Sequence, residues 1–197
     1  ISMAQVAEGG LSTMNDLLQR MRELAVQASN ALNSGGVAGD IGKLKNEYDQ
    51  LGKELGRMLD ATQFNGEKIL NTTASYVFQV GANAGAENQI TIANGDISLS
   101  GNAAFSAVAS GGASATLITG TASANTANIA ALDAAISAVN DRRASLGALQ
   151  SRFENTISYL RTASENQSAA RGRIMDADFA AETANLSRTQ LLQQPAT

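Results

Sequence analysis

The strongest constraint on the fold is a heptad repeat of apolar and small residues near the N-terminus. They recur at alternating steps of three and four: Ala4, Ala7, Leu11, Met14, Leu18, Met21, Ala25, Ala28 and Leu32. This spacing places all of them on one stripe of an α-helix, which packs lengthwise against other helices. Leu17 and Leu24 widen the stripe, so we expect this helix to contact two partners.

Two later segments carry the same repeat. The second contains Ile41, Leu44, Tyr48, Leu51, Leu55 and Met58, and the third contains Ile129, Leu132, Ile136, Val139, Arg143, Leu146, Gln150, Phe153, Ile157 and Leu160. We expect Asp40 to cap the second helix and the third to run from Thr126 to about Ser164. Because the first connection is short, the first two helices should be antiparallel neighbours.

These repeats predict one shared core and one architecture. Six residues on the three stripes should pack together: Leu18, Met21, Tyr48, Leu51, Phe153 and Ile157. The predicted fold is mainly α, an elongated antiparallel helical bundle, or rod, of long heptad-patterned helices with a small β-hairpin. The hairpin comes from two alternating segments, residues 76–80 and 90–92, and Asn65-Gly66 marks a separate turn. Gly52 and Gly56 in the second helix are either tolerated or permit a close backbone approach.

No charged residue occurs from Ile97 to Leu132. The stretch is mostly Ala, Ser, Gly, Thr and Asn, with too few large apolar residues to form a core of its own. It therefore predicts a linker, a small β excursion or a surface loop.

Composition excludes several functional classes. The 197 residues contain no Cys and no His, which removes disulfides, thiolate zinc sites and the Ser–His and Cys–His catalytic pairs. The chain is mildly acidic, with a pI near 4.8, so nucleic-acid binding is not expected. Neither a transmembrane segment nor a signal peptide is expected, and Asp176 and Asp178 fit helix caps better than metal ligands. We predict no enzyme, and no catalytic, cofactor or metal site.

Six segments then point to a known family. They are AEGGL (residues 7–11), QRMRELAVQA (19–28), TQFNG (62–66), FQVGAN (78–83), LGALQSRF (146–153) and AARGRIMDADF (169–179). In order and spacing they resemble bacterial flagellin, over about residues 1–94 and 126–194. The resemblance implies a structural subunit of the bacterial flagellar filament, secreted and extracellular, which serves motility by self-assembly with other flagellin subunits.

The resemblance also implies a domain organisation. Residues 1–94 correspond to the N-terminal part of the flagellin core, 95–125 to a short variable outer segment, 126–175 to the C-terminal core helix and 176–197 to the start of the C-terminal segment. Flagellins extend further at both ends, and there they carry the export signal and the inner coiled coil. We therefore expect a core fragment lacking both terminal segments, which is monomeric on its own.

The segment around Arg20 carries the candidate binding residues. In flagellins it forms a surface that contacts neighbouring subunits and is recognised by the innate immune receptor Toll-like receptor 5. The corresponding residues are Gln19, Arg20, Arg22, Glu23, Leu24, Gln27 and, by counting back from residues 62–66, Glu47. Arg20 falls on the solvent side of the stripe, and Leu24 at its edge is expected to be half exposed. The alternative for this segment is an ordinary solvated helix surface.

A second function remains open for the whole chain. Residues 95–125 could contact a surface or a glycan, which would make the protein an adhesin or a glycan-binding module.

Overall fold

The computed structural model describes residues 1–29, 39–109, 122–175 and 179–193. The main helices are α1 (Ser2–Ala28), α2 (Asp40–Ala61), α5 (Ala122–Met175) and α6 (Phe179–Gln193). Between α2 and α5 lie β1 (Gln63–Phe64), β2 (Glu67–Lys68), β3 (Tyr76–Gln79), the 3-10 helix η2 (Ala86–Asn88), β4 (Gln89–Ile92), α3 (Asn94–Ile97) and α4 (Ala103–Ala109). The fold is mainly α with small antiparallel strand pairs, which confirms the predicted class.

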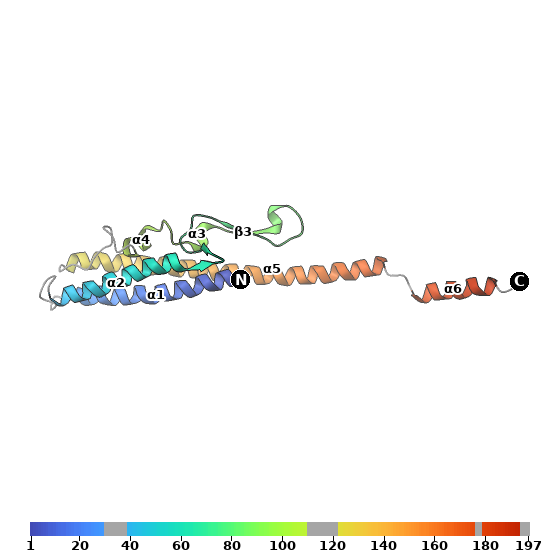
Figure 1. Ribbon diagram of the computed structural model, residues 1–197, viewed down its shortest axis with the longest axis horizontal. Helices are drawn as coiled ribbons and strands as arrows, with labels where there is room; N and C mark the ends of the chain where they lie inside the picture. Colours follow the sequence, from blue (N-terminus) through green and yellow to red (C-terminus); the bar gives the residue numbers. More distant parts are fainter. Residues whose placement is uncertain (30–38, 110–121, 176–178, 194–197) are drawn as a thin grey trace. The chain divides into compact units, whose positions relative to one another are not determined.

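The chain divides into two compact units, Ile1–Glu154 and Asn155–Thr197. In the first unit, α1, α2 and the first part of α5 lie side by side (Figure 1). The heptad repeat explains this packing, because its residues on α1 from Ala4 to Ala28 are all buried. Asp40 is the first residue of α2, not its cap; the cap position is Gly39, which has no side chain to bond the helix end.

Ion pairs show that α1 and α5 run in opposite directions. Arg22 on α1 pairs with Asp133 on α5 at 2.6 Å, and Glu8, nearer the start of α1, pairs with Arg143 at 2.8 Å. Arg143 occupies a heptad position, so its bond to Glu8 agrees with the general use of polar heptad residues to fix the register of packed helices.

The shared core is confirmed for most of its predicted members. Leu18, Met21 and Tyr48 are buried, and Leu51 and Phe153 are partly buried against them. Ile157 is the exception. It is 39% exposed and belongs to the second unit, so the prediction that it joins this core is wrong. α5 continues past Glu154, where the first unit ends, and the apolar repeat continues with it.

The glycines of α2 mark a close approach of α4. A Cβ on Gly52 would stand 3.2 Å from the carbonyl oxygen of Val108, and one on Gly56 would stand 2.7 Å from that of Ala109. The second distance is too short for any side chain without a shift of the backbone. Of the two alternatives for these glycines, the close backbone approach is therefore the correct one.

Both turn predictions are confirmed. β1 pairs with β2 across Asn65 and Gly66, whose φ angles of 53° and 84° fit a tight two-residue hairpin. β3 pairs antiparallel with β4, with Phe78 opposite Ile90. This places Phe78 on the same hairpin face as the buried Ile90, and its ring meets that of Phe153 on α5 edge to face, 5.6 Å between centroids.

The uncharged stretch is better ordered than predicted. Ile97, Leu99, Phe105 and Val108 are all buried, in or beside α3 and α4. They complete a core supplied mainly by the long helices, so the prediction of a linker, a small β excursion or a surface loop is wrong for residues 97–109. Residues 110–121 lie outside the described part of the chain.

The second unit contains the end of α5 and α6. α5 extends from Ala122 to Met175, longer at both ends than the predicted span from Thr126 to Ser164. Beyond Glu154 most of its described side chains are exposed. The predicted last helix is present as α6, whereas the suggested caps Asp176 and Asp178 lie outside the described residues.

Candidate functional site

Two of the predicted site residues meet on neighbouring helices. The Arg20 guanidinium on α1 lies 2.7 Å from the Glu47 carboxylate on α2, and its Nε donates a second hydrogen bond of 2.9 Å to the same oxygen. The Arg20 Nη1 also donates to Glu23, one turn further along α1, at 3.0 Å. The sequence repeats explain the meeting, since they make α1 and α2 adjacent antiparallel helices.

These two glutamates stabilise the charged form of Arg20. Its pKa is raised above the ordinary arginine value, first by the hydrogen bond that it donates to Glu47, then by the one that it donates to Glu23. Arg20 is nevertheless half exposed, with 51% of its side chain accessible, and Glu47 is 45% exposed. A partner could therefore reach the guanidinium without unfolding either helix. Exposed pairs of this kind add little to stability, so the arrangement suits recognition better than folding.

Arg22 extends the charged surface toward the third helix. Its Nε donates to the Asp133 carboxylate on α5 at 2.6 Å, and this bond raises the pKa of Arg22. Arg22 was expected at the site, but Asp133 was not. No motif surrounds Asp133, and only the antiparallel register of α1 and α5 could have identified it.

The exposure of Leu24 differs from the prediction. The sequence suggested a half-exposed residue at the edge of the stripe, but Leu24 is only 1% exposed and belongs to the core. The reason is that α1 packs against helices on both sides of its stripe, which covers the edge positions as well. Leu24 thus supports the site from within and is not available to a partner.

The remaining predicted residues lie on one exposed stripe of α1. Gln19, Glu23 and Gln27 follow one another at single-turn spacing, and all three are exposed. With Arg20, Arg22, Glu47 and Asp133 they form what we call the charged surface of α1, α2 and α5. Such a surface can bind a protein with complementary charge and hydrogen-bonding groups.

Two other kinds of feature, a cluster of metal ligands and a membrane-spanning helix, are absent from the described residues. They contain no cluster of three or more acidic side chains that could hold a metal ion. Within the same ranges, none of the helices combines the length and the apolar character that crossing a membrane requires.

The second unit presents a different surface. Several large apolar side chains on α5 and α6 are exposed there: Ile157, Tyr159, Ile174, Met175 and Leu186. Tyr159 is 72% and Ile174 is 82% exposed. A contact with another protein segment would remove such side chains from water.

Two models of protein families match this chain. The model of the bacterial flagellin N-terminal helical region matches residues 1–75, and that of the bacterial flagellin C-terminal helical region matches residues 129–197. The two matches contain α1, α2 and the described parts of α5 from Ile129 and of α6. Members of this family are structural proteins, not enzymes.

Individual proteins that resemble this chain are also flagellins or flagellar filament proteins. A flagellin of Halalkalibacterium halodurans is 43% identical over 98% of this chain and 67% of its own length. The flagellar filament 33 kDa core protein of Treponema phagedenis is 38% identical over the whole chain and 70% of its own length. The crystal structure of Bacillus cereus flagellin matches with a TM-score of 0.60 and 27% identity, over 86% of this chain and 90% of that one. This chain belongs to the bacterial flagellin family.

Proposed function

We propose that the chain is a structural subunit of the bacterial flagellar filament, which acts in motility by packing its helices against other copies. Its membership of the flagellin family supports this function, and so does a relative named as a flagellar filament core protein. The observation that carries the proposal is the exposure of Tyr159, Ile174, Met175 and Leu186 in the second unit. A filament interface would cover such side chains and gain their hydrophobic free energy.

The flagellar filament is extracellular, so the subunit is exported from the cell. The first unit already buries its own core, and we expect these 197 residues alone to remain monomeric in dilute buffer. Light scattering coupled to size exclusion measures this directly. Ordered fibres formed by the isolated chain would contradict it.

A cellular experiment tests the filament function. Deletion of the gene should abolish filaments seen by electron microscopy, and the unaltered gene should restore them. An Ile174→Glu variant should fail to restore them, because a charge replaces an exposed apolar contact, whereas the matched Ile174→Leu variant should succeed. Intact filaments after deletion, with adhesion lost, would instead support the adhesin alternative. Residues 97–108 do not favour that alternative, since their large apolar side chains are buried.

The charged surface of α1, α2 and α5 supports a second, finer proposal, that Toll-like receptor 5 recognises it. The resemblance of residues 19–28 to flagellin suggests the receptor, and the exposed pairing of Arg20 with Glu47 supplies a compact charged contact. An arginine at the centre of an interface is often a hot spot, worth about 2 kcal/mol or more. In flagellins the same face contacts a neighbouring subunit, so soluble subunits should signal while intact filaments should not.

Substitution of Arg20 tests the receptor proposal. Arg20→Ala should lower potency in a receptor reporter assay roughly thirtyfold, while the helical circular dichroism stays unchanged. Arg57→Ala is a matched control, because Arg57 is also exposed and also paired with a glutamate one turn away, but lies on α2 outside this surface. Equal loss of potency in both variants, or none in either, would contradict the proposal.

A further inference from the structure

The tight turn between β1 and β2 contains the one residue other than glycine, among those described, that has a positive φ angle. This residue is Asn65, with a φ of 53°; Gly66 follows with 84°, and both are exposed. Asparagine is among the few residues that tolerate this conformation, which explains its place in the turn. The same dipeptide also brings a side-chain amide next to a main-chain nitrogen whose own residue has no side chain.

The two groups that would react with each other are accessible. The nucleophile is the main-chain nitrogen of Gly66, and the electrophile is the side-chain amide carbon of Asn65. Neither the Gly66 amide nor the Asn65 side chain has a hydrogen-bond partner among the residues that the structure describes. A Cβ built on Gly66 would find no atom within 4 Å, so the turn is open to water. Glycine also adds no side chain that would hinder the attack.

Only a short ladder holds this turn. Closure of a ring between Asn65 and Gly66 requires a rotation of the Asn65 backbone. The paired residues of β1 and β2 oppose that rotation, but each strand has two residues, and all of them are exposed. A two-stranded ladder of this length is marginally stable, so the turn can open locally at low cost.

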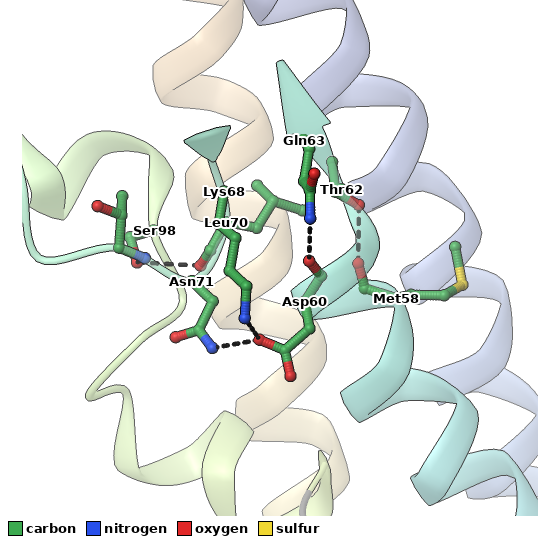
Figure 2. Close-up of polar contacts among 9 residues, drawn as sticks. Met58, Asp60, Thr62, Gln63, Lys68, Leu70, Asn71 and Ser98 are labelled. Carbon is green, nitrogen blue, oxygen red and sulfur yellow. Dashed lines mark hydrogen bonds and ion pairs between the residues drawn. The ribbon is translucent and has the colours of Figure 1, made fainter. Parts of the chain in front are cut away.

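The base of the hairpin is held more firmly than its tip. Asp60, near the end of α2, accepts hydrogen bonds from the Lys68 ammonium and the Asn71 side-chain amide, both at 2.7 Å (Figure 2). Ile69, directly after β2, is only 1% exposed, and its amide donates to the Thr62 carbonyl at 3.2 Å. Opening of the turn therefore need not disturb the core of the first unit.

A second Asn-Gly pair in the same chain provides a contrast. Asn94 and Gly95 are the first two residues of α3. The Asn94 carbonyl accepts a hydrogen bond from the Ser98 amide at 2.9 Å, and its amide donates to the Ser75 hydroxyl at 3.3 Å. The side-chain oxygen of Asn94 is buried. The backbone of Asn94 is thus held on both sides, which opposes the rotation that ring closure needs.

We propose that Asn65 is a site of spontaneous deamidation through a succinimide. The Gly66 nitrogen bonds to the side-chain carbon of Asn65, the bond from that carbon to the amide nitrogen breaks, and ammonia leaves with the proton that Gly66 loses. Water then hydrolyses one of the two imide bonds. Cleavage of the new bond leaves aspartate at position 65, and cleavage of the original peptide bond leaves isoaspartate. The reaction does not depend on the filament function.

Isoaspartate would destroy the turn in which it forms. It continues the main chain through the former side-chain carbon, which adds one atom between the two strands. A two-residue hairpin depends on a positive φ at both loop residues, and the longer chain no longer provides that geometry. We therefore expect β1 and β2 to separate after conversion to isoaspartate, while Ile69 stays buried.

Ageing of the full 197-residue chain in mildly alkaline buffer tests the proposal. Peptide mass spectrometry with fragmentation that separates aspartate from isoaspartate measures the products. The same chain unfolded by urea in the same buffer gives the intrinsic rate of each Asn-Gly pair. We expect folding to slow the conversion of Asn65 by less than about tenfold, and Asn94 to convert at least about tenfold more slowly than Asn65 in the folded protein.

Asn65→Gly is the matched variant, because glycine adopts the same positive φ without strain and carries no amide. The amide resonances of β1 and β2 should shift during ageing of the unaltered protein, in step with the formation of isoaspartate, and should stay unchanged in the variant. Three results would overturn the proposal: an intact Asn65 in the folded protein after the unfolded chain has converted, equal rates at Asn65 and Asn94 in the folded protein, or the same shifts in the variant.

Discussion

The replacement of Tyr48 by phenylalanine is expected to stabilise the protein. Tyr48 lies on the buried side of α2 with only 2% of its surface exposed, and its hydroxyl has no hydrogen-bond partner among the described residues. A buried hydroxyl without a partner costs roughly 1–3 kcal/mol, because it has lost its hydrogen bonds to water. Phenylalanine keeps the ring in the core and removes this cost. We expect Tyr48→Phe to raise the free energy of unfolding at pH 7 by about 1 kcal/mol.

The same residue makes stability depend on alkaline pH. Burial, and then the negative charge of Asp49, raise the pKa of Tyr48 to about 12. In the unfolded chain a tyrosine titrates near 10. The folded state therefore holds this proton more tightly, so its contribution to stability is complete below pH 10 and is lost as pH rises toward 12. At pH 11 the loss amounts to about 1.4 kcal/mol, and it is absent in Tyr48→Phe.

Urea unfolding followed by circular dichroism at 222 nm, at pH 7, 9 and 11, measures both effects. The gap between Tyr48→Phe and the unaltered protein should widen by about 1.4 kcal/mol between pH 9 and pH 11. Tyr159→Phe is the matched control, since Tyr159 is 72% exposed, and it should change stability by less than about 0.5 kcal/mol.

Two results would refute this reasoning about Tyr48. A loss of more than about 1 kcal/mol in Tyr48→Phe at pH 7 would mean that the hydroxyl has a strong partner in the core. A gap that stays constant between pH 9 and pH 11 would mean that the buried tyrosine is not the alkaline-sensitive group.

Four further substitutions test the packing by the same urea measurement. Gly56→Ala should lower the free energy of unfolding by about 1–3 kcal/mol, because its Cβ would meet an α4 carbonyl at 2.7 Å. Gly9→Ala, with open space around it, should raise the free energy of unfolding by up to about 1 kcal/mol, because alanine has the higher helix propensity. Equal effects of the two substitutions would contradict the close approach of α4. Leu24→Ala should lower the free energy of unfolding by about 2–5 kcal/mol, as expected for a fully buried leucine, and a decrease below about 1 kcal/mol would contradict its burial. Phe153→Ala should lower the free energy of unfolding by less, about 1–3 kcal/mol, because Phe153 is only partly buried. It should also shift the amide resonances of β3, and unchanged β3 resonances would contradict the ring contact with Phe78.

The helices could be predicted from the sequence because the heptad repeat reports packing along a whole element. Leu11, Leu18 and Leu146 are buried where the repeat places them. The same repeat continues through Ile157, however, which is exposed. Periodicity shows which side of a helix is apolar, but it does not show where the partner helix ends.

The short helices escaped prediction for a different reason. Ile97, Leu99, Phe105 and Val108 are too few and too widely spaced to form a core, so composition suggested a loop. Phe105 and Val108 on α4 are buried where α2 presents glycines that let α4 approach closely. The helical spacing of Phe105 and Val108, read together with the paired glycines of α2, was the available signal.

The candidate site could be predicted in part. Arg20 and Glu47 came from the resemblance to flagellin, and their contact follows from the antiparallel arrangement that the repeats imply. The bond of Arg22 to Asp133 depends on how α5 covers α1, over a sequence separation of more than one hundred residues. Such a contact has no local signal in the chain.

The contrast between the two parts of α5 connects the fold to the proposed assembly. Up to Glu154 the helix buries Leu132, Val139 and Leu146 within the first unit, so folding stabilises its helical form there. Beyond that point Tyr159 and Ile174 stay exposed, and an isolated helix of this length is only marginally stable in water. Continuity with the folded part removes the cost of nucleating the helix, because the first turns already exist. Tyr159 and Ile174 are thus presented on a preformed helix, and a neighbouring subunit that covers them need not order this part of the chain first.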